Sequence, residues 1–226
     1  MATYDNLMSQ LTFKFPFKKK YYEQDFYVSS NNFSAYRLIE SWPNWPGKWV
    51  NIFGPKGCGK THLSNILKKK IRSVKIIQAK DIDNEKTFNL DKLDCLIVDS
   101  FDQNIDEKLL YSILNHSKQQ NIYILINSYL PLKDFDYQLQ DLRSRAKSFV
   151  NLGIELPTDD LLRVIISKSF SEKQIEITPK ISEYIIKHIE RSYEKVFKFI
   201  KEIDDLSLSS GKSININLIK KVLKNE

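Results

Sequence analysis

The segment from Gly54 to Thr61 contains the residue types that hold a phosphate group. It reads Gly-Pro-Lys-Gly-Cys-Gly-Lys-Thr and matches the pattern G-x-x-x-x-G-K-[ST] at every position. Three of the six glycines in the chain fall here, where a positive φ or a close approach of ligand to backbone is needed. In such a loop Lys60 neutralises the β- and γ-phosphates and the Thr61 hydroxyl ligates Mg²⁺. The segment therefore predicts a nucleotide site.

A strand must lead into this loop and a helix must leave it. Residues 49–53 (Trp-Val-Asn-Ile-Phe) are apolar and β-prone, and Leu63, Ile66 and Leu67 recur at helical spacing after Thr61. Backbone N–H groups and the positive end of the helix then face the phosphates together. The flanking sequence thus supports the phosphate-binding interpretation.

A second apolar run ends in a carboxylate. Residues 93–99 are typical of a buried parallel strand, and we expect Asp99 on the metal side of the site, the alternative being a strand-end cap of the next turn. In hydrolytic P-loop enzymes of the ring-forming type, a second acid usually follows. Here Ser100 follows, and a serine cannot act as a carboxylate base. We therefore expect weak or no intrinsic hydrolysis.

Strands and helices alternate up to Pro157. Strands are expected at 49–53, 74–78, 93–99, 122–126 and 149–156, with helices at 106–118 and 138–147, which together indicate a parallel α/β sheet. Beyond it only helical spacing persists, at 181–191, 193–208 and 215–223, with helix starts at Thr158 and Thr178. The expected fold is an α/β AAA+ P-loop NTPase core with a five-stranded parallel sheet (residues 21–157), a small all-helical lid domain (158–226), and an N-terminal peptide and linker (1–20).

Composition excludes several classes. The chain has 226 residues and is 42% hydrophobic, which is enough for a sizeable core, and no apolar run approaches the about 18 residues of a membrane span. Its start lacks a charged-then-apolar leader, and two cysteines fit a reducing cytosol, so a cytoplasmic protein is expected. The net charge of +7 leaves nucleic-acid binding open, although most lysines stand singly or in short runs.

The region before the phosphate loop resembles a known family. Residues 25–35 resemble the segment N-F-V-x-G-x-x-N-x-x-A that holds the adenine in DnaA and its relatives, with Ser29 in place of the glycine. Residues 42–46 (Trp-Pro-Asn-Trp-Pro) resemble the W-P-x-W-P of the Hda family of DnaA-related AAA+ regulators, and the resemblance extends from about residue 8 to the end. The resemblance and the loop together imply that ADP or ATP contacts Phe26, Val28, Asn32, Gly54, Pro55, Lys56, Gly57, Cys58, Gly59, Lys60, Thr61 and His62, with Mg²⁺ at Thr61 and Asp99.

The amino-terminal segment resembles the Hda peptide Q-L-x-L-x-L that docks on the replicative sliding clamp. In this peptide Gln10 would form hydrogen bonds while Leu11, Phe13 and Phe15 enter an apolar groove, since alternate side chains of an extended chain share one face. An ordinary strand added to the sheet is the alternative. The sequence ends after the lid, so the helix-turn-helix DNA-binding domain of DnaA is not expected.

Residues 141–145 (Asp-Leu-Arg-Ser-Arg) resemble the D-L-x-S-R of the same family. The resemblance implies that Arg145 is an arginine finger acting in trans, with Arg143 in support; the alternative is a pair of surface arginines on an amphipathic helix. An arginine finger can accelerate hydrolysis by about 10³ to 10⁵.

The chain departs from the family at two sensor positions. Glu194 stands where the lid often carries an arginine that reaches the nucleotide, and Arg191, three residues earlier, is the expected substitute. Residues 127–129 (Asn-Ser-Tyr) replace the usual T-[SG]-D, which leaves Asn127 at the nucleotide. With Ser100, these changes predict a nucleotide such as ADP that is held as a structural ligand.

The resemblance as a whole implies a negative regulator of replication initiation with DnaA and the sliding clamp as partners, DNA contacted indirectly, no membrane, and self-association possible. Three other functions stay open: a helicase loader of the DnaC type that hydrolyses ATP itself, a basic DNA-binding module, and a small-molecule kinase.

Overall fold

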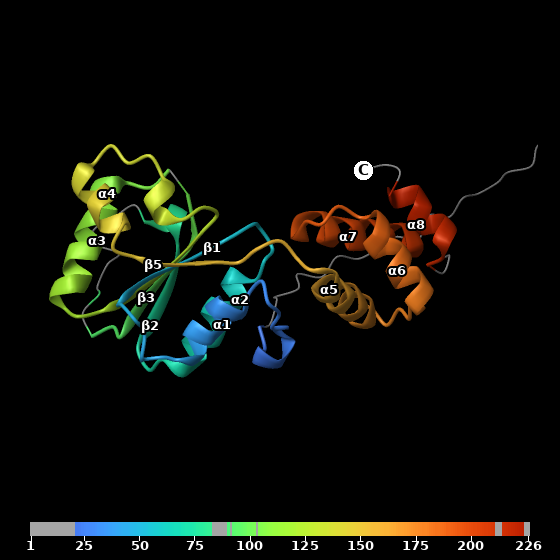
Figure 1. The fold of residues 1–226 in the computed structure, drawn as a ribbon, viewed down its shortest axis with the longest axis horizontal. Coiled ribbons are helices and arrows are strands. Elements are labelled where there is room, and N and C mark those ends of the chain that lie inside the picture. Colours follow the sequence, from blue (N-terminus) through green and yellow to red (C-terminus); the bar gives the residue numbers. More distant parts are fainter. Residues whose placement is uncertain (1–20, 83–89, 91, 103, 211–213, 224–226) are drawn as a thin grey trace, which may run out of the picture. The chain divides into compact units, whose positions relative to one another are not determined.

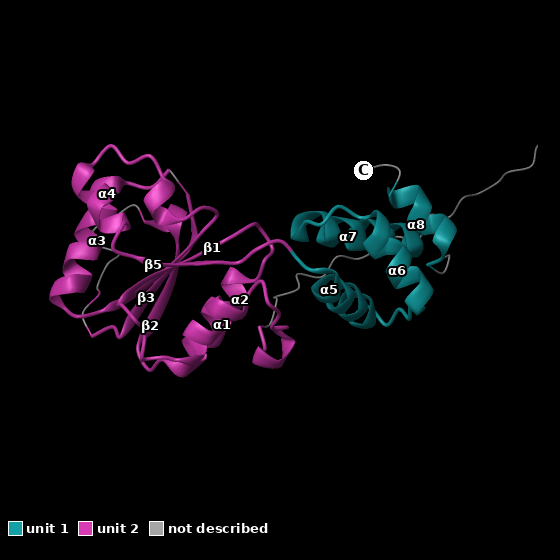
Figure 2. Cartoon of the chain, in the orientation of Figure 1, with its two compact units in different colours: residues 1–20, 157–226 teal, residues 21–156 magenta. Residues whose placement is uncertain are grey.

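The computed structural model describes residues 21–82, 90, 92–102, 104–210 and 214–223. The described residues form two compact units, 21–156 and 157–223 (Figure 2). The expected clamp peptide, Gln10 to Phe15, lies outside the described residues.

The first unit is built on a parallel sheet of five strands: β1 (Trp49–Phe53), β2 (Val74–Gln78), β3 (Cys95–Phe101), β4 (Tyr123–Ser128) and β5 (Val150–Gly153). Their order across the sheet is β2-β3-β4-β1-β5. Because β1 lies between β4 and β5, the direction of the connections reverses at its carboxyl end. Open α/β sheets bind ligands at such a point, and the glycine-rich loop begins there. The expected fold class is confirmed.

Helices cover both faces of this sheet. Figure 1 shows α1 (Phe33–Glu40) and α2 (Lys60–Lys70) on one side, and α3 (Glu107–Gln119) and α4 (Gln140–Ala146) on the other. Short 3₁₀ turns lie at Glu23–Asp25, Ala79–Asp81 and Leu132–Asp134. The Asp106 carboxylate caps α3 by accepting from the backbone N–H groups of Lys108 and Leu109.

Some element ends differ from the sequence prediction. β3 continues past Asp99 to Phe101, with a shift of register against β4 between Val98 and Phe101. β5 ends at Gly153, where a strand to residue 156 was expected, and beyond it the Glu155 N–H donates to the Asn31 carbonyl. Contacts made after the strand therefore set its end.

The second unit contains four described helices: α5 (Asp159–Ser171), α6 (Pro179–His188), α7 (Tyr193–Ser210) and α8 (Ile216–Leu223). Thr158 and Thr178 cap α5 and α6 as expected, since each side chain accepts a backbone N–H three residues on. The helix expected over 181–191 ends at His188 instead. No helix in the described part of the chain is long and apolar enough to cross a membrane.

Asn51 is a polar residue in the centre of the sheet. Its side chain is fully buried in β1 and donates to the Ile126 carbonyl (2.9 Å) and the Ser128 hydroxyl (2.8 Å), while its oxygen accepts from the Leu132 N–H (3.0 Å). Asn51 therefore fixes the chain that leaves β4.

Replacing Asn51 with alanine should lower the free energy of unfolding by about 2 to 4 kcal/mol, because buried partners would lose their hydrogen bonds. Chemical denaturation of the full chain measures this change. The control is Asn44→Ala, at an exposed position, where a change within about 0.5 kcal/mol is expected. Equal stabilities of the two variants would show that the Asn51 bonds contribute nothing net.

Candidate functional site

The loop between β1 and α2 has a backbone that favours glycine. Gly54, Gly57 and Gly59 have φ values of 153°, 86° and 104°. A Cβ on Gly54 would lie 2.4 Å from the Ile154 carbonyl oxygen, and one on Gly59 would lie 2.9 Å from the Phe26 ring. A side chain at either position would distort the loop, which explains the concentration of glycine found in the sequence.

The loop leads directly into the amino end of α2. Gly59 precedes the helix in a left-handed conformation and no side chain caps it. The first N–H groups of α2 thus lack a side-chain acceptor, as in sites where a helix end binds an anion. The Lys60 ammonium lies over the loop and donates to the carbonyls of Gly54 (2.7 Å) and Pro55 (2.9 Å).

Cys58 of the same loop is a buried thiol. Its Sγ lies 3.6 Å from Lys60 Nζ, and burial raises the pKa of the thiol although Lys60 opposes the shift. A raised pKa keeps the sulfur protonated at neutral pH. Cys58 therefore fills space in the loop and is not activated as a nucleophile.

The expected metal pair is brought together from α2 and β3. Thr61 Oγ1 donates to Asp99 Oδ2 at 2.8 Å, and Asp99 is only 3% exposed. A hydroxyl and a carboxylate oxygen fit a hard cation such as Mg²⁺. No group of three or more acidic, histidine or cysteine side chains that could hold a metal occurs among the described residues.

Asn127 holds the Asp99 carboxylate. It is fully buried at the end of β4, and its Nδ2 donates to Asp99 Oδ1 (2.9 Å) and to Ser64 Oγ (2.7 Å). Both amide hydrogens are thereby used within the protein, while Oδ1 is buried without a partner among the described residues. The sequence prediction placed Asn127 at the nucleotide and missed Ser64. The available signal in the sequence was a serine beside Leu63 on the helical face that otherwise carries apolar residues.

Ser100 occupies the position after Asp99 with a strained backbone. Its φ is 58°, it lies in the register shift of β3, and its N–H donates to Asp99 Oδ1 (3.0 Å). Ser100 is exposed. The structure describes no carboxylate at this position, and the next acid, Asp102, accepts instead from the Asn104 N–H.

The segment before α1 lies against the loop through aromatic contacts. The Phe26 ring stacks on Tyr36 (centroids 5.9 Å apart) and meets His62 edge-on (5.3 Å). Asn32 is buried and ties its own turn together, accepting from Ser29 N–H and donating to the Tyr27 carbonyl. Phe26 and His62 are therefore adjacent to the loop, whereas the Asn32 side chain is occupied within the segment. Val28 is half-buried in the same segment.

Arg145 lies at the end of the sheet opposite the glycine-rich loop. It lies in the last turn of α4, where Nη2 donates to Asn115 Oδ1 (2.9 Å) and the guanidinium lies 5.7 Å from the centre of the Trp49 ring. Trp49 begins β1, whereas the glycine-rich loop follows the end of β1. Five residues of strand span about 16 Å, so Arg145 does not reach its own loop. Arg143, two residues earlier on α4, is exposed.

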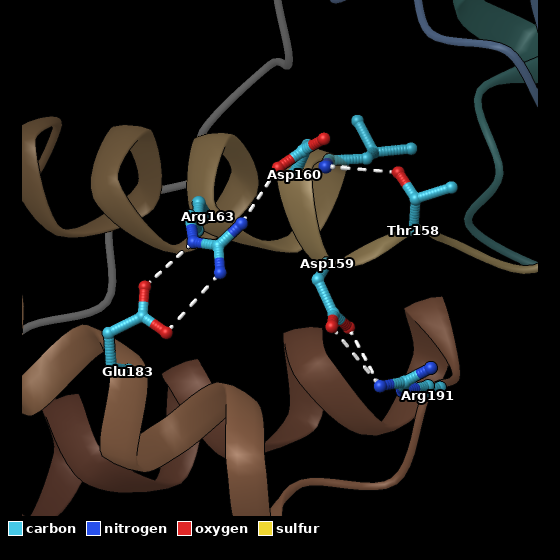
Figure 3. A network of polar contacts seen from close by, with 7 residues as sticks. Thr158, Asp159, Asp160, Arg163, Glu183 and Arg191 are labelled. Carbon is cyan, nitrogen blue, oxygen red and sulfur yellow. Dashed lines mark hydrogen bonds and ion pairs between the residues drawn. The ribbon is translucent and has the colours of Figure 1, made fainter.

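Arg191 lies in the turn before α7, outside the helix expected there. It pairs with Asp159 at the start of α5, with Nη2 at 3.0 Å from Oδ1 and 3.2 Å from Oδ2 (Figure 3). In the same view Arg163 bridges Asp160 and Glu183. The side chains of Arg191 and Asp159 are 64% and 42% exposed, and pairs of this kind contribute about 0 to 1 kcal/mol.

The first unit has a parallel sheet with this strand order and a glycine-rich phosphate loop after β1, and the second unit is helical. These features define an AAA+ P-loop protein. Residues 159–223 match a family described as "Hda, lid domain". Chromosomal replication initiator protein DnaA from Borrelia garinii subsp. bavariensis is 27% identical, over 95% of this chain and 55% of that protein. DnaA from Buchnera aphidicola subsp. Cinara cedri is 24% identical, over 91% of this chain and 53% of that protein.

Solved structures show the same fold. Domain III of DnaA from Thermotoga maritima superposes with a TM-score of 0.72 at 18% identity, over 93% of this chain and 98% of that one. A point variant of RuvB from Thermotoga maritima gives a TM-score of 0.63 at 19% identity, over 86% of this chain and 67% of that one. The chain spans about half the length of the curated relatives it matches. Its fold is that of AAA+ proteins, it is similar to DnaA over most of its length, and residues 159–223 match the lid domain of Hda.

Proposed function

We propose that this chain is a negative regulator of DNA replication initiation. It would bind ADP or ATP with Mg²⁺, dock on the sliding clamp through residues 10–15, and stimulate hydrolysis of ATP held by DnaA. The observation that carries the proposal is the position of Arg145, at the opposite end of β1 from the phosphate loop of its own chain.

Nucleotide binding at the glycine-rich loop is supported by the uncapped start of α2 and by the adjacent Thr61 and Asp99 oxygens. DnaA from Aquifex aeolicus, a structural relative with a TM-score of 0.65, is bound to AMPPCP. Lys60 would exchange its contacts with loop carbonyls for phosphate oxygens, which are stronger, charged acceptors. Mg²⁺ at Thr61 and Asp99 would supply charge neutralisation between phosphates.

Slow turnover of this nucleotide follows from the residues near Asp99. Ser100 cannot take a proton from water as a carboxylate would. Asn127 donates its two amide hydrogens to Asp99 and Ser64, so neither is directed at the γ-phosphate. Arg191, the expected substitute for the sensor arginine, is paired with Asp159 within the helical unit. The bound nucleotide would thus persist as a structural ligand.

Arg145 would act on a nucleotide outside its own chain. An arginine finger stabilises charge that develops on the γ-phosphate during transfer. Only one hydrogen bond to protein holds the Arg145 guanidinium among the residues described, so most of its five N–H donors are available. Arg143, exposed two residues earlier, would assist the approach.

Clamp docking depends on the N-terminal peptide. Replacing Gln10 and Leu11 together with alanine should weaken clamp binding by at least about tenfold, because the peptide would lose an apolar anchor and the hydrogen bonds of the glutamine. Surface plasmon resonance on immobilised clamp measures this, with Lys18→Ala in the same segment as control. Unchanged affinity of the double variant would favour the alternative in which the segment is a strand of the sheet.

The experiment that tests the function is ATP hydrolysis by DnaA with this protein and with clamp loaded on DNA, each added separately and together. Stimulation should need both additions. Hydrolysis by this protein alone would instead support a helicase loader of the DnaC type. Salt-sensitive binding of naked DNA without clamp would support a DNA-binding module.

A further inference from the structure

A cleft opens at the amino ends of the strands, beside Arg145. It has a volume of about 270 Å³, and its lining includes Lys48, Trp49, Lys118, Asn121, Arg145 and Ser148. These residues come from the start of β1, the end of α3, the turn before β4 and the end of α4, all within residues 21–156. We refer to it as the Lys48–Arg145 cleft.

The charge of this cleft is uniformly positive. Three cationic side chains line it and no carboxylate does. None of the three has an ion-pair partner among the residues that the structure describes. Lys118 is exposed in the last turn of α3, while Lys48 and Arg145 are partly buried. Unpaired cations converging on one hollow favour a multiply charged anion.

The wall of the cleft is held rigidly. The Trp49 indole N–H donates to Ser117 Oγ (3.2 Å), and Ser117 in turn donates to the Leu114 carbonyl (2.8 Å). Arg145 lies over the face of that indole and bonds to Asn115. The Arg145 donors are thus positioned before any ligand arrives, an arrangement that favours the stabilisation of charge.

Lys48 is positioned by the neighbouring turn. Its Nζ donates to the Asn121 carbonyl (3.1 Å) and lies 4.7 Å from the centre of the Tyr123 ring. Asn121 presents that carbonyl from a left-handed conformation (φ 62°). A lysine has three N–H donors, so Lys48 retains donors for a ligand.

The size of the cleft limits its ligand. Pockets for whole small molecules occupy about 300 to 1,000 Å³, and this one, at about 270 Å³, is smaller. It suits the phosphate end of a nucleotide whose base and sugar lie elsewhere. We propose that the Lys48–Arg145 cleft is a second phosphate-binding site, in which Lys48 and Lys118 act with Arg145 on the terminal phosphates of a nucleotide held by another protein.

This inference rests on the proposed function for the identity of that protein, DnaA, but binding in the cleft is measurable without it. The full chain is saturated with ADP to fill its own loop and then titrated with inorganic triphosphate. The Trp49 indole N–H signal in NMR spectra, with calorimetry, reports occupancy. Lys118→Ala should weaken triphosphate binding about tenfold, since one of three cations is lost.

Lys108→Ala is the matched control. Lys108 is an exposed lysine at the other end of α3, about 15 Å along the helix, and its loss should change triphosphate binding less than about twofold. The two variants should rank in the same order when stimulation of DnaA is measured. No saturable shift of Trp49, or equal losses in both variants, would overturn the inference.

The same two assays separate this inference from the proposed function. Triphosphate binding that depends on Lys118, without any stimulation of DnaA, would reject the function and retain the phosphate site. Stimulation that requires Arg145 but is identical in the Lys118→Ala and Lys108→Ala variants would retain the function and reject a role for the lysines.

Discussion

Replacement of Arg145 with alanine is expected to lower the stimulated rate of DnaA-bound ATP hydrolysis by about 10³-fold or more, the scale of an arginine finger acting in trans. The guanidinium makes one hydrogen bond, to Asn115, and one ring contact, with Trp49, among the described residues, so its loss should leave folding largely intact. Single-turnover hydrolysis of labelled ATP preloaded on DnaA measures the rate. Binding of the variant to the clamp should equal that of the wild type.

Two further variants test what Arg145 contributes. Arg145→Lys retains the charge but not the planar fork of donors, and should restore only a small part of the stimulation. Arg72→Ala removes an exposed arginine beyond the end of α2 and should stimulate normally. Full stimulation by Arg145→Ala would contradict the finger assignment.

Replacement of Lys60 with alanine is expected to weaken binding of ADP to this chain by about 100-fold, equivalent to about 2.7 kcal/mol and within the range for hydrogen bonds to charged groups. The lysine would otherwise place its ammonium on the phosphates, next to the uncapped end of α2. Titration with a fluorescent ADP analogue measures the affinity.

The control for Lys60→Ala lies in the same helix. Lys68 is exposed two turns further along α2, and Lys68→Ala should bind the analogue as the wild type does. If Lys60→Ala also bound it normally, the glycine-rich loop would not be the nucleotide site of this protein.

The fold could be predicted from the sequence because the patterns that indicate it are local. Buried parallel strands read as apolar runs, and the loop at Gly54 to Thr61 is a contiguous pattern. The helix caps at Thr158 and Thr178 are equally local, since each side chain bonds to the backbone three residues on. Such features need no knowledge of which strand lies beside which.

Features that bring together distant segments of the chain could not be predicted from the sequence. The contact of Asn127 with Asp99 and Ser64 joins β4, β3 and α2. The Lys48–Arg145 cleft likewise needs the amino ends of β1 and β4 to be neighbours. No spacing along the chain encodes these pairings, because they follow from the strand order.

The end of α6 shows tertiary packing overriding a periodic pattern. Apolar spacing over 181–191 predicts one helix, yet Ile189 is extended (φ −85°, ψ 144°) and packs into the core of the second unit. The helix therefore stops at His188, and Arg191 falls in the following turn. There it meets Asp159, a contact that the helical spacing did not suggest.

The most direct test of the central claim is single-turnover hydrolysis of labelled ATP on DnaA, with wild-type protein and DNA-loaded clamp. A control contains this protein and labelled ATP without DnaA. Rapid conversion to ADP on DnaA is expected only when protein and clamp are both present, with negligible turnover in the control. No acceleration on DnaA, together with steady turnover in the control, would contradict the central claim and identify an autonomous ATPase.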